Sequence, residues 1–210
     1  MAIDDLLDEH EQGERVQTWL RRNGAGLIGG VVLGLGLIGG WQWWQGQQAG
    51  RRMQAGDDYQ AVLTALAAKD IKQAQTRASG LKGSAYAPLV ALDLAKAQLA
   101  ANQRDAAIAT LRGVTASDAS VQQVIDQRLA RLLIDAGKSA DALILLDSAS
   151  DPAGLEVRGD AQRALGKRDD ARKAYADALT KLDVRAPQRA LLELKLTEVG
   201  GTPSQPEARI

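Results

Sequence analysis

The stretch from Asn23 to Gly50 contains no Lys, Arg, Asp or Glu, although charged residues flank it on both sides. Its most apolar part, residues 24–44, reads GAGLIGGVVLGLGLIGGWQWW. At about 1.5 Å per residue, a helix of this length extends about 31 Å, which is enough to cross the roughly 30 Å hydrocarbon core of a bilayer. The sequence therefore predicts a short tail, a membrane anchor and a large C-terminal domain.

We interpret the apolar stretch as an uncleaved anchor rather than as a signal peptide. A signal peptide begins with a short basic region and ends at a small-residue cleavage site. Here the preceding tail is acidic, and the apolar run ends in Trp41, Trp43 and Trp44. The chain contains no cysteine, which excludes anchoring through an acylated cysteine.

Basic residues beside the anchor indicate its direction. Arg15, Arg21 and Arg22 precede it, whereas Arg51 and Arg52 follow it closely. Because cytoplasmic flanks carry the excess of Lys and Arg, this slight bias favours a cytoplasmic N-terminus.

Glycines four residues apart lie along the anchor. Small residues at this spacing let a second helix approach closely within lipid. An intramembrane packing face and an anchor without a helical partner are alternative interpretations. The packing face would consist of Gly26, Gly30, Gly34, Gly36 and Gly40.

The composition excludes some classes of protein. The chain has 26 basic and 26 acidic residues, and the basic ones are interspersed with acids, which is not the pattern of a nucleic-acid-binding surface. The lack of cysteine fits an envelope domain that needs no disulfides. Aromatic residues make up only 3% of the chain, so we expect a core of closely packed Ala- and Leu-rich helices.

After residue 54 the sequence predicts helices in pairs. Apolar residues recur at intervals of three and four, and no run alternates as a strand does, so we expect an all-α domain. Asn102, Gly137 and Gly166 each precede, by five positions, an alanine at 107, 142 or 171; a fainter copy ends at residue 74. Asn or Gly suits the left-handed residue that ends a helix, and the small alanine lets the next helix pack closely.

The spacing of these copies is near the 34-residue period of tetratricopeptide repeats. We therefore predict a tetratricopeptide-like solenoid of helical hairpins, with a generic α-bundle as the alternative. A final helix, residues 188–199, would cap its open end. The residues expected to pack the repeats are Ala107, Gly137, Ala142, Gly159, Gly166, Ala171, Tyr175 and Ala178. Whether the membrane helix continues without a break to residue 67 stays open.

The sequence offers no support for an enzyme, a cofactor or a metal site. His10 is the only histidine and lies in the acidic tail, on the other side of the anchor from the large domain. The carboxylate pairs Asp57–Asp58 and Asp169–Asp170 lie at predicted helix starts, where acids favour the helix dipole. We interpret both pairs as capping groups rather than as acid–base catalysts.

Binding is the function that remains. A short solenoid presents a groove built from the first helix of each pair, and such grooves hold peptides or partner helices. The candidate groove residues are Gln98, Gln127, Arg131, Arg158 and Gln162. For each of them, a solvated polar face is the alternative interpretation.

Several stretches together resemble a known family. They are GWQWW at Gly40–Trp44, YAPLVALDLA at Tyr86–Ala95, QRLAR at Gln127–Arg131, GDA at Gly159–Ala161 and DVRAP at Asp183–Pro187. With the acidic tail and the repeats, this ordered combination resembles the YfgM-type ancillary subunits of the bacterial SecYEG translocon, over nearly the whole chain.

The resemblance implies an inner-membrane protein with a cytoplasmic N-terminus and periplasmic repeats. Family partners would be the SecYEG translocon and PpiD, a membrane-anchored periplasmic chaperone, and the function would be to help pass translocated proteins to periplasmic chaperones. The alternative is an envelope or cell-division adaptor with the same repeat architecture. The implied parts are a cytoplasmic tail at 1–22, a transmembrane helix at 23–48, a periplasmic repeat domain at 49–199 and a disordered tail at 200–210.

Overall fold

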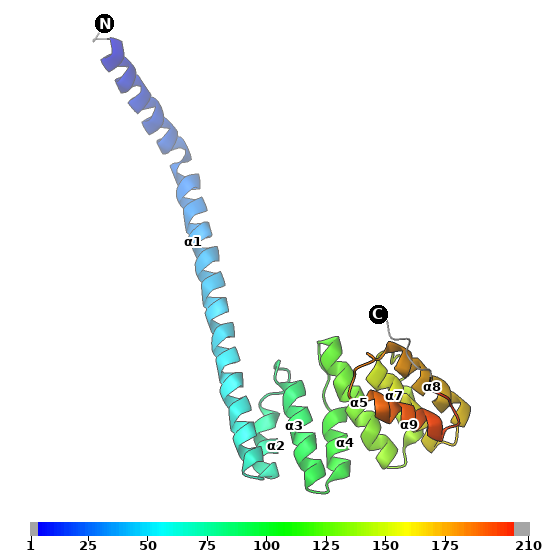
Figure 1. Ribbon diagram of the computed structural model, residues 1–210. Coiled ribbons are helices and arrows are strands. Elements are labelled where there is room, and N and C mark those ends of the chain that lie inside the picture. Colours follow the sequence, from blue (N-terminus) through cyan, green and yellow to red (C-terminus); the bar gives the residue numbers. More distant parts are fainter. Residues whose placement is uncertain (1–3, 204–210) are drawn as a thin grey trace. The chain divides into compact units, whose positions relative to one another are not determined.

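A computed structural model describes residues 4–203 of the 210-residue chain. Every helix or strand assigned within this range is an α-helix (Figure 1), so the predicted all-α fold class is confirmed. The chain divides into two compact units, residues 1–54 and residues 55–210. Of the tail predicted to be disordered, residues 204–210 lie outside the described residues, whereas Gly200 and Gly201 belong to a hydrogen-bonded turn.

The first unit is formed by the helix α1, Asp4–Ala67, which also supplies the first helix of the second unit. The continuation to residue 67 that the sequence left open is therefore present. Within α1, the segment Val16–Ala67 includes a stretch long and apolar enough to cross a membrane, and none of that stretch is buried in protein. Leu33 and Leu37 expose 70% and 75% of their surface, so the apolar part of α1 lacks the one-sided burial of a soluble helix, which α1 shows only at its end, where Val62 is buried.

The second unit, which we call the repeat unit, continues with eight further helices within the described residues. The end of α1 and the helix α2 (Ile71–Ser79) form the first helical pair. The second pair consists of α3 (Ala87–Ala100) and α4 (Arg104–Arg112). The remaining helices are α5 (Ala119–Asp135), α6 (Ser139–Leu145), α7 (Pro152–Ala164), α8 (Arg168–Lys181) and α9 (Arg189–Glu198). Consecutive helices pack against each other, which is the arrangement of a helical-hairpin solenoid.

One turn recurs five times in the repeat unit, always after the first helix of a pair. In each copy a backbone N–H donates to the carbonyl oxygen five residues earlier, over 2.7 to 2.9 Å, as in a Schellman motif. We call the accepting residue the turn residue. The turn residues are Ala65, Gln98, Leu133, Gln162 and Leu196.

Four places after each turn residue, the backbone has a positive φ. The residues at this place are Lys69, Asn102, Gly137, Gly166 and Gly200. Glycine and asparagine adopt this conformation more readily than other residues, which explains the Asn and Gly marks in the sequence. The first copy is faint because Lys69 occupies the same place.

Nine places after each of the first four turn residues lies a completely buried alanine. These residues are Ala74, Ala107, Ala142 and Ala171, all 0% exposed. Each stands in the second helix of its pair, where a methyl group lets the two helix axes approach closely. Ala178, one further predicted packing residue, is also completely buried in α8.

In the last full pair, glycine and tyrosine take complementary places. A Cβ added to Gly159 in α7 would overlap the ring of Tyr175 in α8. The corresponding pair is Ala130 of α5 with Leu146, the C-cap of α6, where both side chains are buried and the second one is smaller than tyrosine. The missing side chain at Gly159 therefore makes room for the phenol ring.

The helix α9 ends the described part of the repeat unit. Leu192 and Leu196 of α9, with its C-cap Val199, are buried in the same core cluster as Tyr175 of α8. The Nζ atom of Lys195 lies 2.6 Å from a carboxylate oxygen of Glu156 in α7. The helix α9 is followed by the fifth copy of the turn, so it corresponds to the first helix of a pair.

Candidate interaction surface

The first helices of the second and third pairs, α3 and α5, carry equivalent stripes of side chains. Each stripe consists of four residues: those nine, six and two positions before the turn residue, and the one directly after it. Steps of three and four residues keep these places on one helix face. The stripe residues are Leu89, Leu92, Lys96 and Leu99 on α3, and Val124, Gln127, Arg131 and Ile134 on α5. Because α3 and α5 contact each other, we treat the two stripes as one surface, the first-helix stripe.

This stripe combines exposed apolar side chains with exposed cations. Leu89, Leu99 and Val124 expose 41%, 38% and 39% of their surface. Lys96 and Arg131 occupy the same place in consecutive pairs, and both are exposed. Apolar contacts beside two cations suit an amphipathic partner segment that carries acidic residues.

On the next first helix, α7, the equivalent charged places are occupied by contacts within the chain. The carboxylates of Glu156 and Asp160 accept hydrogen bonds from Lys195 of α9 at 2.6 and 2.8 Å. Arg163 pairs with Glu198 of α9 at 3.3 Å. The equivalent face of α7 is therefore covered by α9, whereas the first-helix stripe on α3 and α5 stays open.

The hydroxyl of Tyr175 belongs to the same cluster of charges. Its oxygen donates to the second carboxylate oxygen of Asp160, over 2.7 Å. Burial of the ring raises the pKa of Tyr175 well above its ordinary value, and the hydrogen bond to Asp160 raises that pKa further. Tyr175 is therefore a protonated donor that orients Asp160 toward Lys195.

The structure places three predicted groove residues at or near the surface. Arg131 is exposed within the first-helix stripe. Gln127 also belongs to the stripe, but its side-chain amide donates to Asp151, the N-cap of α7, over 3.0 Å. Arg158 is half-buried and donates to the carbonyl oxygen of Asp147 over 3.4 Å.

The prediction that Gln98 and Gln162 line a groove is wrong. Both are turn residues, and they expose only 0% and 9% of their surface. The side chain of Gln98 accepts a hydrogen bond from Thr110 in the second helix of its pair, over 2.8 Å. At this place the side chain lies between the two helices of a pair, so it faces the core instead of solvent.

The repeat register contained the signal that would have found the missing stripe residues. The turn marked by Asn102 and Gly137 fixes the place of each turn residue, four positions earlier. Counting two further positions back from each turn residue gives Lys96 and Arg131. Arg131 but not Lys96 is among the predicted groove residues, because the groove prediction takes polar residues of the first helices without this register and so includes the buried turn residue Gln98.

The structure also locates the carboxylate pairs. Asp169 and Asp170 lie in the first turn of α8, as predicted, and Asp169 pairs with Arg172 over 2.7 Å. The prediction that Asp57–Asp58 starts a helix is wrong, because both residues lie inside α1. The cause is the continuation of the anchor helix into the first pair.

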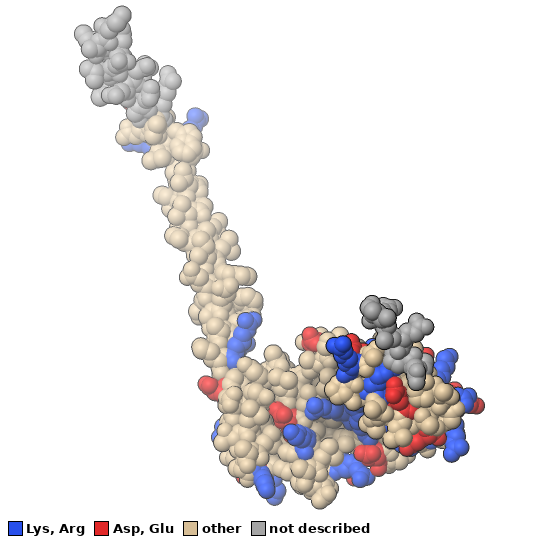
Figure 2. Space-filling view, viewed as in Figure 1, with Lys and Arg blue, Asp and Glu red and all other residues tan. Residues whose placement is uncertain are grey.

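Charged residues are distributed differently in the two units. Figure 2 shows Lys, Arg, Asp and Glu scattered over the visible face of the repeat unit, with no large area of one sign. In the first unit, the predicted packing glycines lie in the uncharged part of α1, and a Cβ added to any of them would meet nothing within 4 Å. The glycine face is thus open along the described helix.

Helical-hairpin repeats that follow a long apolar helix define a helical-repeat protein with a candidate membrane anchor. The family model of the tetratricopeptide repeat-like domain matches residues 17–201, and the chain belongs to this family.

Three relatives are similar to the chain over most of its length, and each is named ancillary SecYEG translocon subunit. The relative from Escherichia coli K12 is 28% identical over 200 residues, which cover 91% of this chain and 97% of the relative. The relative from Aggregatibacter actinomycetemcomitans is 26% identical, over 92% of this chain and 98% of the relative. The relative from Haemophilus influenzae is 26% identical, over 82% of this chain and 89% of the relative.

Proposed function

We propose that this chain is a single-span scaffold of the bacterial inner membrane that associates with the SecYEG translocon. The observation that carries the proposal is the joint match of anchor and repeats, because the named relatives align with both parts. In the proposed topology the N-terminal tail is cytoplasmic and the repeat unit is periplasmic. The transmembrane helix would lie at 23–48, inside the longer helix α1.

The repeat unit would bind a protein partner through the first-helix stripe. Its exposed Leu89, Leu99 and Val124 supply apolar contact area, while Lys96 and Arg131 select for acidic groups. A PpiD-like periplasmic chaperone is the partner that we propose for this surface. By holding such a chaperone beside the channel, the scaffold would help newly translocated proteins reach it.

The anchor has a physical role in this scheme. Confinement to the membrane near the channel raises the effective concentration of the repeat unit for partners at the exit site, so modest affinity suffices. The packing glycines, Gly26, Gly30, Gly34, Gly36 and Gly40, would let α1 approach another transmembrane helix closely. The scheme uses positioning and binding, and it requires no catalytic group.

Affinity isolation of the full chain from native membranes in mild detergent tests the proposal. We expect SecYEG and a periplasmic chaperone to be recovered with the wild-type chain. Lys96→Glu with Arg131→Glu should lower recovery of the chaperone about fivefold and leave recovery of SecYEG unchanged. The matched control is Lys138→Glu with Lys173→Glu, which makes the same change of charge at two exposed positions outside the stripe.

Failure to recover SecYEG with the wild-type chain would contradict the proposed association. Equal loss of the chaperone in the stripe variant and the control would contradict the role of the stripe. Recovery of cell-wall or division proteins in place of SecYEG would favour the envelope-adaptor alternative.

A further inference from the structure

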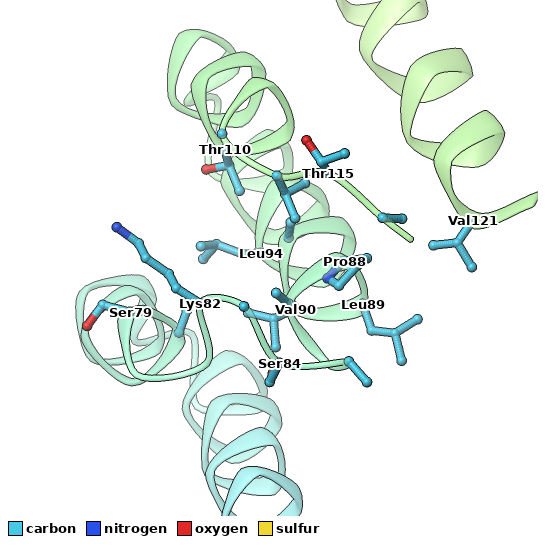
Figure 3. A pocket seen from close by; sticks show the side chains of 18 of the residues that line it. Ser79, Lys82, Ser84, Pro88, Leu89, Val90, Leu94, Thr110, Thr115 and Val121 are labelled. Carbon is cyan, nitrogen blue, oxygen red and sulfur yellow. The ribbon is translucent and has the colours of Figure 1, made fainter. Parts of the chain in front are cut away.

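A cavity of about 990 Å³ lies in the repeat unit, apart from the first-helix stripe except for Leu89 at its edge. Figure 3 shows it between the end of α2 and the end of α4, over the N-terminal half of α3. Pro88, Val90 and Leu94 of α3 supply its apolar floor, and the loop at 113–118 forms one wall. Its volume is at the upper end of the range for small-molecule sites, so it has room for a short run of side chains.

The wall at 113–118 offers free backbone groups. This segment joins α4 to α5 without a helical turn at residues 114–116. The amide N–H groups of Val114 and Thr115 donate to no acceptor among the described residues, whereas the N–H of Ala116 donates to Gln122. Free backbone donors beside an apolar floor suit an extended chain, because an extended chain presents its own carbonyl groups for pairing and a helix does not.

The charges of the lining select the kind of extended chain. Among the described residues that line the cavity, only Lys82 and Asp118 are ionisable. Asp118 is engaged as the N-cap of α5, since its carboxylate accepts from Ser120 and Val121 at 2.9 and 3.0 Å. Lys82 is exposed and has no carboxylate within 4 Å among the described residues, and Figure 3 shows its ammonium extending away from the apolar floor. One cation at the edge of an apolar cavity is complementary to an apolar segment that carries one carboxylate.

We propose that this cavity binds an extended, mainly apolar polypeptide segment with an acidic residue beside Lys82. The inference deepens the proposed function and rests on it for the source of the segment, which would be an unfolded protein leaving the channel. The apolar side chains of the segment pack against the exposed Leu89 and over the floor that the largely buried Val90 and Leu94 form. Its backbone pairs with Val114 and Thr115, and its carboxylate pairs with Lys82. The scaffold then has two protein-binding surfaces, one for a folded partner and one for an unfolded segment.

The test is fluorescence anisotropy with the full chain in detergent micelles. The probe is a labelled ten-residue peptide of Ala, Val, Leu and Ser with one Asp, compared with the same peptide carrying Lys in place of Asp. We expect the wild-type chain to bind the Asp peptide more tightly than the Lys peptide. In the Lys82→Glu variant, the affinity for the Asp peptide should fall about fivefold, so that the preference is reversed. Lys138→Glu, an equal change of charge at an exposed residue outside the cavity, should leave the preference unchanged.

A second variant tests the cavity itself. Ala109 is exposed on α4 and lines the cavity, so Ala109→Trp should fill the opening and abolish binding without disturbing the core. Ala140→Trp, at an exposed position on α6, is the matched control and should bind normally. Circular dichroism on both variants verifies that the helices are retained.

Two results would overturn the inference. The first is peptide binding that is insensitive to Ala109→Trp. The second is a chain that has twice the monomer mass and does not bind the peptide, which would assign the cavity to a second copy of the chain. The outcome is separable from that of the proposed function. Peptide binding that depends on Ala109 and Lys82 stands even if SecYEG is not recovered, and recovery of SecYEG does not rescue a cavity that fails this test.

Discussion

At the scale of single residues, Gly159 and Tyr175 are two residues of the repeat pattern that pack directly against each other. Gly159→Ala should reduce the free energy of unfolding by about 2 kcal/mol, because its Cβ overlaps the Tyr175 ring and either the ring or α7 must move. Urea unfolding of the full chain in micelles, followed by circular dichroism, measures this change. Tryptophan fluorescence does not report it, since all four tryptophans precede the repeat unit.

A double variant controls for this result. Gly159→Ala with Tyr175→Leu recreates the pair that Ala130 and Leu146 form in the preceding repeat, so it should recover part of the lost stability. A single variant as stable as the wild-type chain would show that the two residues do not compete for one space.

The buried phenol of Tyr175 predicts a loss of stability at alkaline pH. Because the pKa of Tyr175 is raised in the folded state, its contribution is fully present below the ordinary tyrosine pKa of about 10 and is lost as the pH rises toward the folded-state pKa. Above about pH 10 the wild-type chain should therefore lose stability more steeply than Tyr175→Phe. Urea midpoints between pH 8 and 11 measure the difference, and parallel curves for the two chains would contradict it.

Individual side chains were predicted from the sequence only where backbone geometry restricts the choice. Gly137 and Gly166 stood out because a positive φ favours glycine, and Ala107 and Ala142 stood out by their fixed distance from these turns. Gln98 was misplaced because a polar side chain on a helix gives no sign of which face it occupies until the register is known.

At the scale of elements, α9 depends on charges as well as on apolar contacts. Lys195→Met should leave the half-buried carboxylates of Glu156 and Asp160 without their cation and should lower the free energy of unfolding by about 1–3 kcal/mol. Hydrogen exchange followed by mass spectrometry should show faster exchange in α9 and unchanged exchange in α3. Lys173→Met, at an exposed residue of α8, is the control. Equal exchange of α9 in both variants would assign its docking to apolar contacts alone.

The helices and their pairing were largely readable from the sequence, but the start of the first repeat was not. Turn marks and buried alanines recur with each pair, so the second to fourth pairs were recognised. The first pair uses Lys69 in place of Gly or Asn, and its first helix continues from the anchor without a capping signal. The sequence therefore predicts a helix start at Asp57–Asp58, although nothing interrupts α1 there.

At the scale of the whole molecule, the proposed topology can be tested because the chain has no cysteine. A cysteine in place of Ala100 should react with a membrane-impermeant maleimide in intact spheroplasts. A cysteine in place of Glu14 should react only after the inner membrane is permeabilised. The reverse pattern would contradict a cytoplasmic N-terminus with periplasmic repeats.

The most direct test of the central claim is site-specific photo-crosslinking of the full chain in intact membranes. Probes would replace Gly30 or Gly36 in the anchor and Lys96 or Arg131 in the first-helix stripe, with Lys138 as the site outside both. The account predicts crosslinks from the anchor to subunits of the SecYEG channel and from the stripe to a periplasmic chaperone, with none of these from Lys138. Crosslinks from the anchor and the stripe to cell-wall or division proteins alone would contradict it.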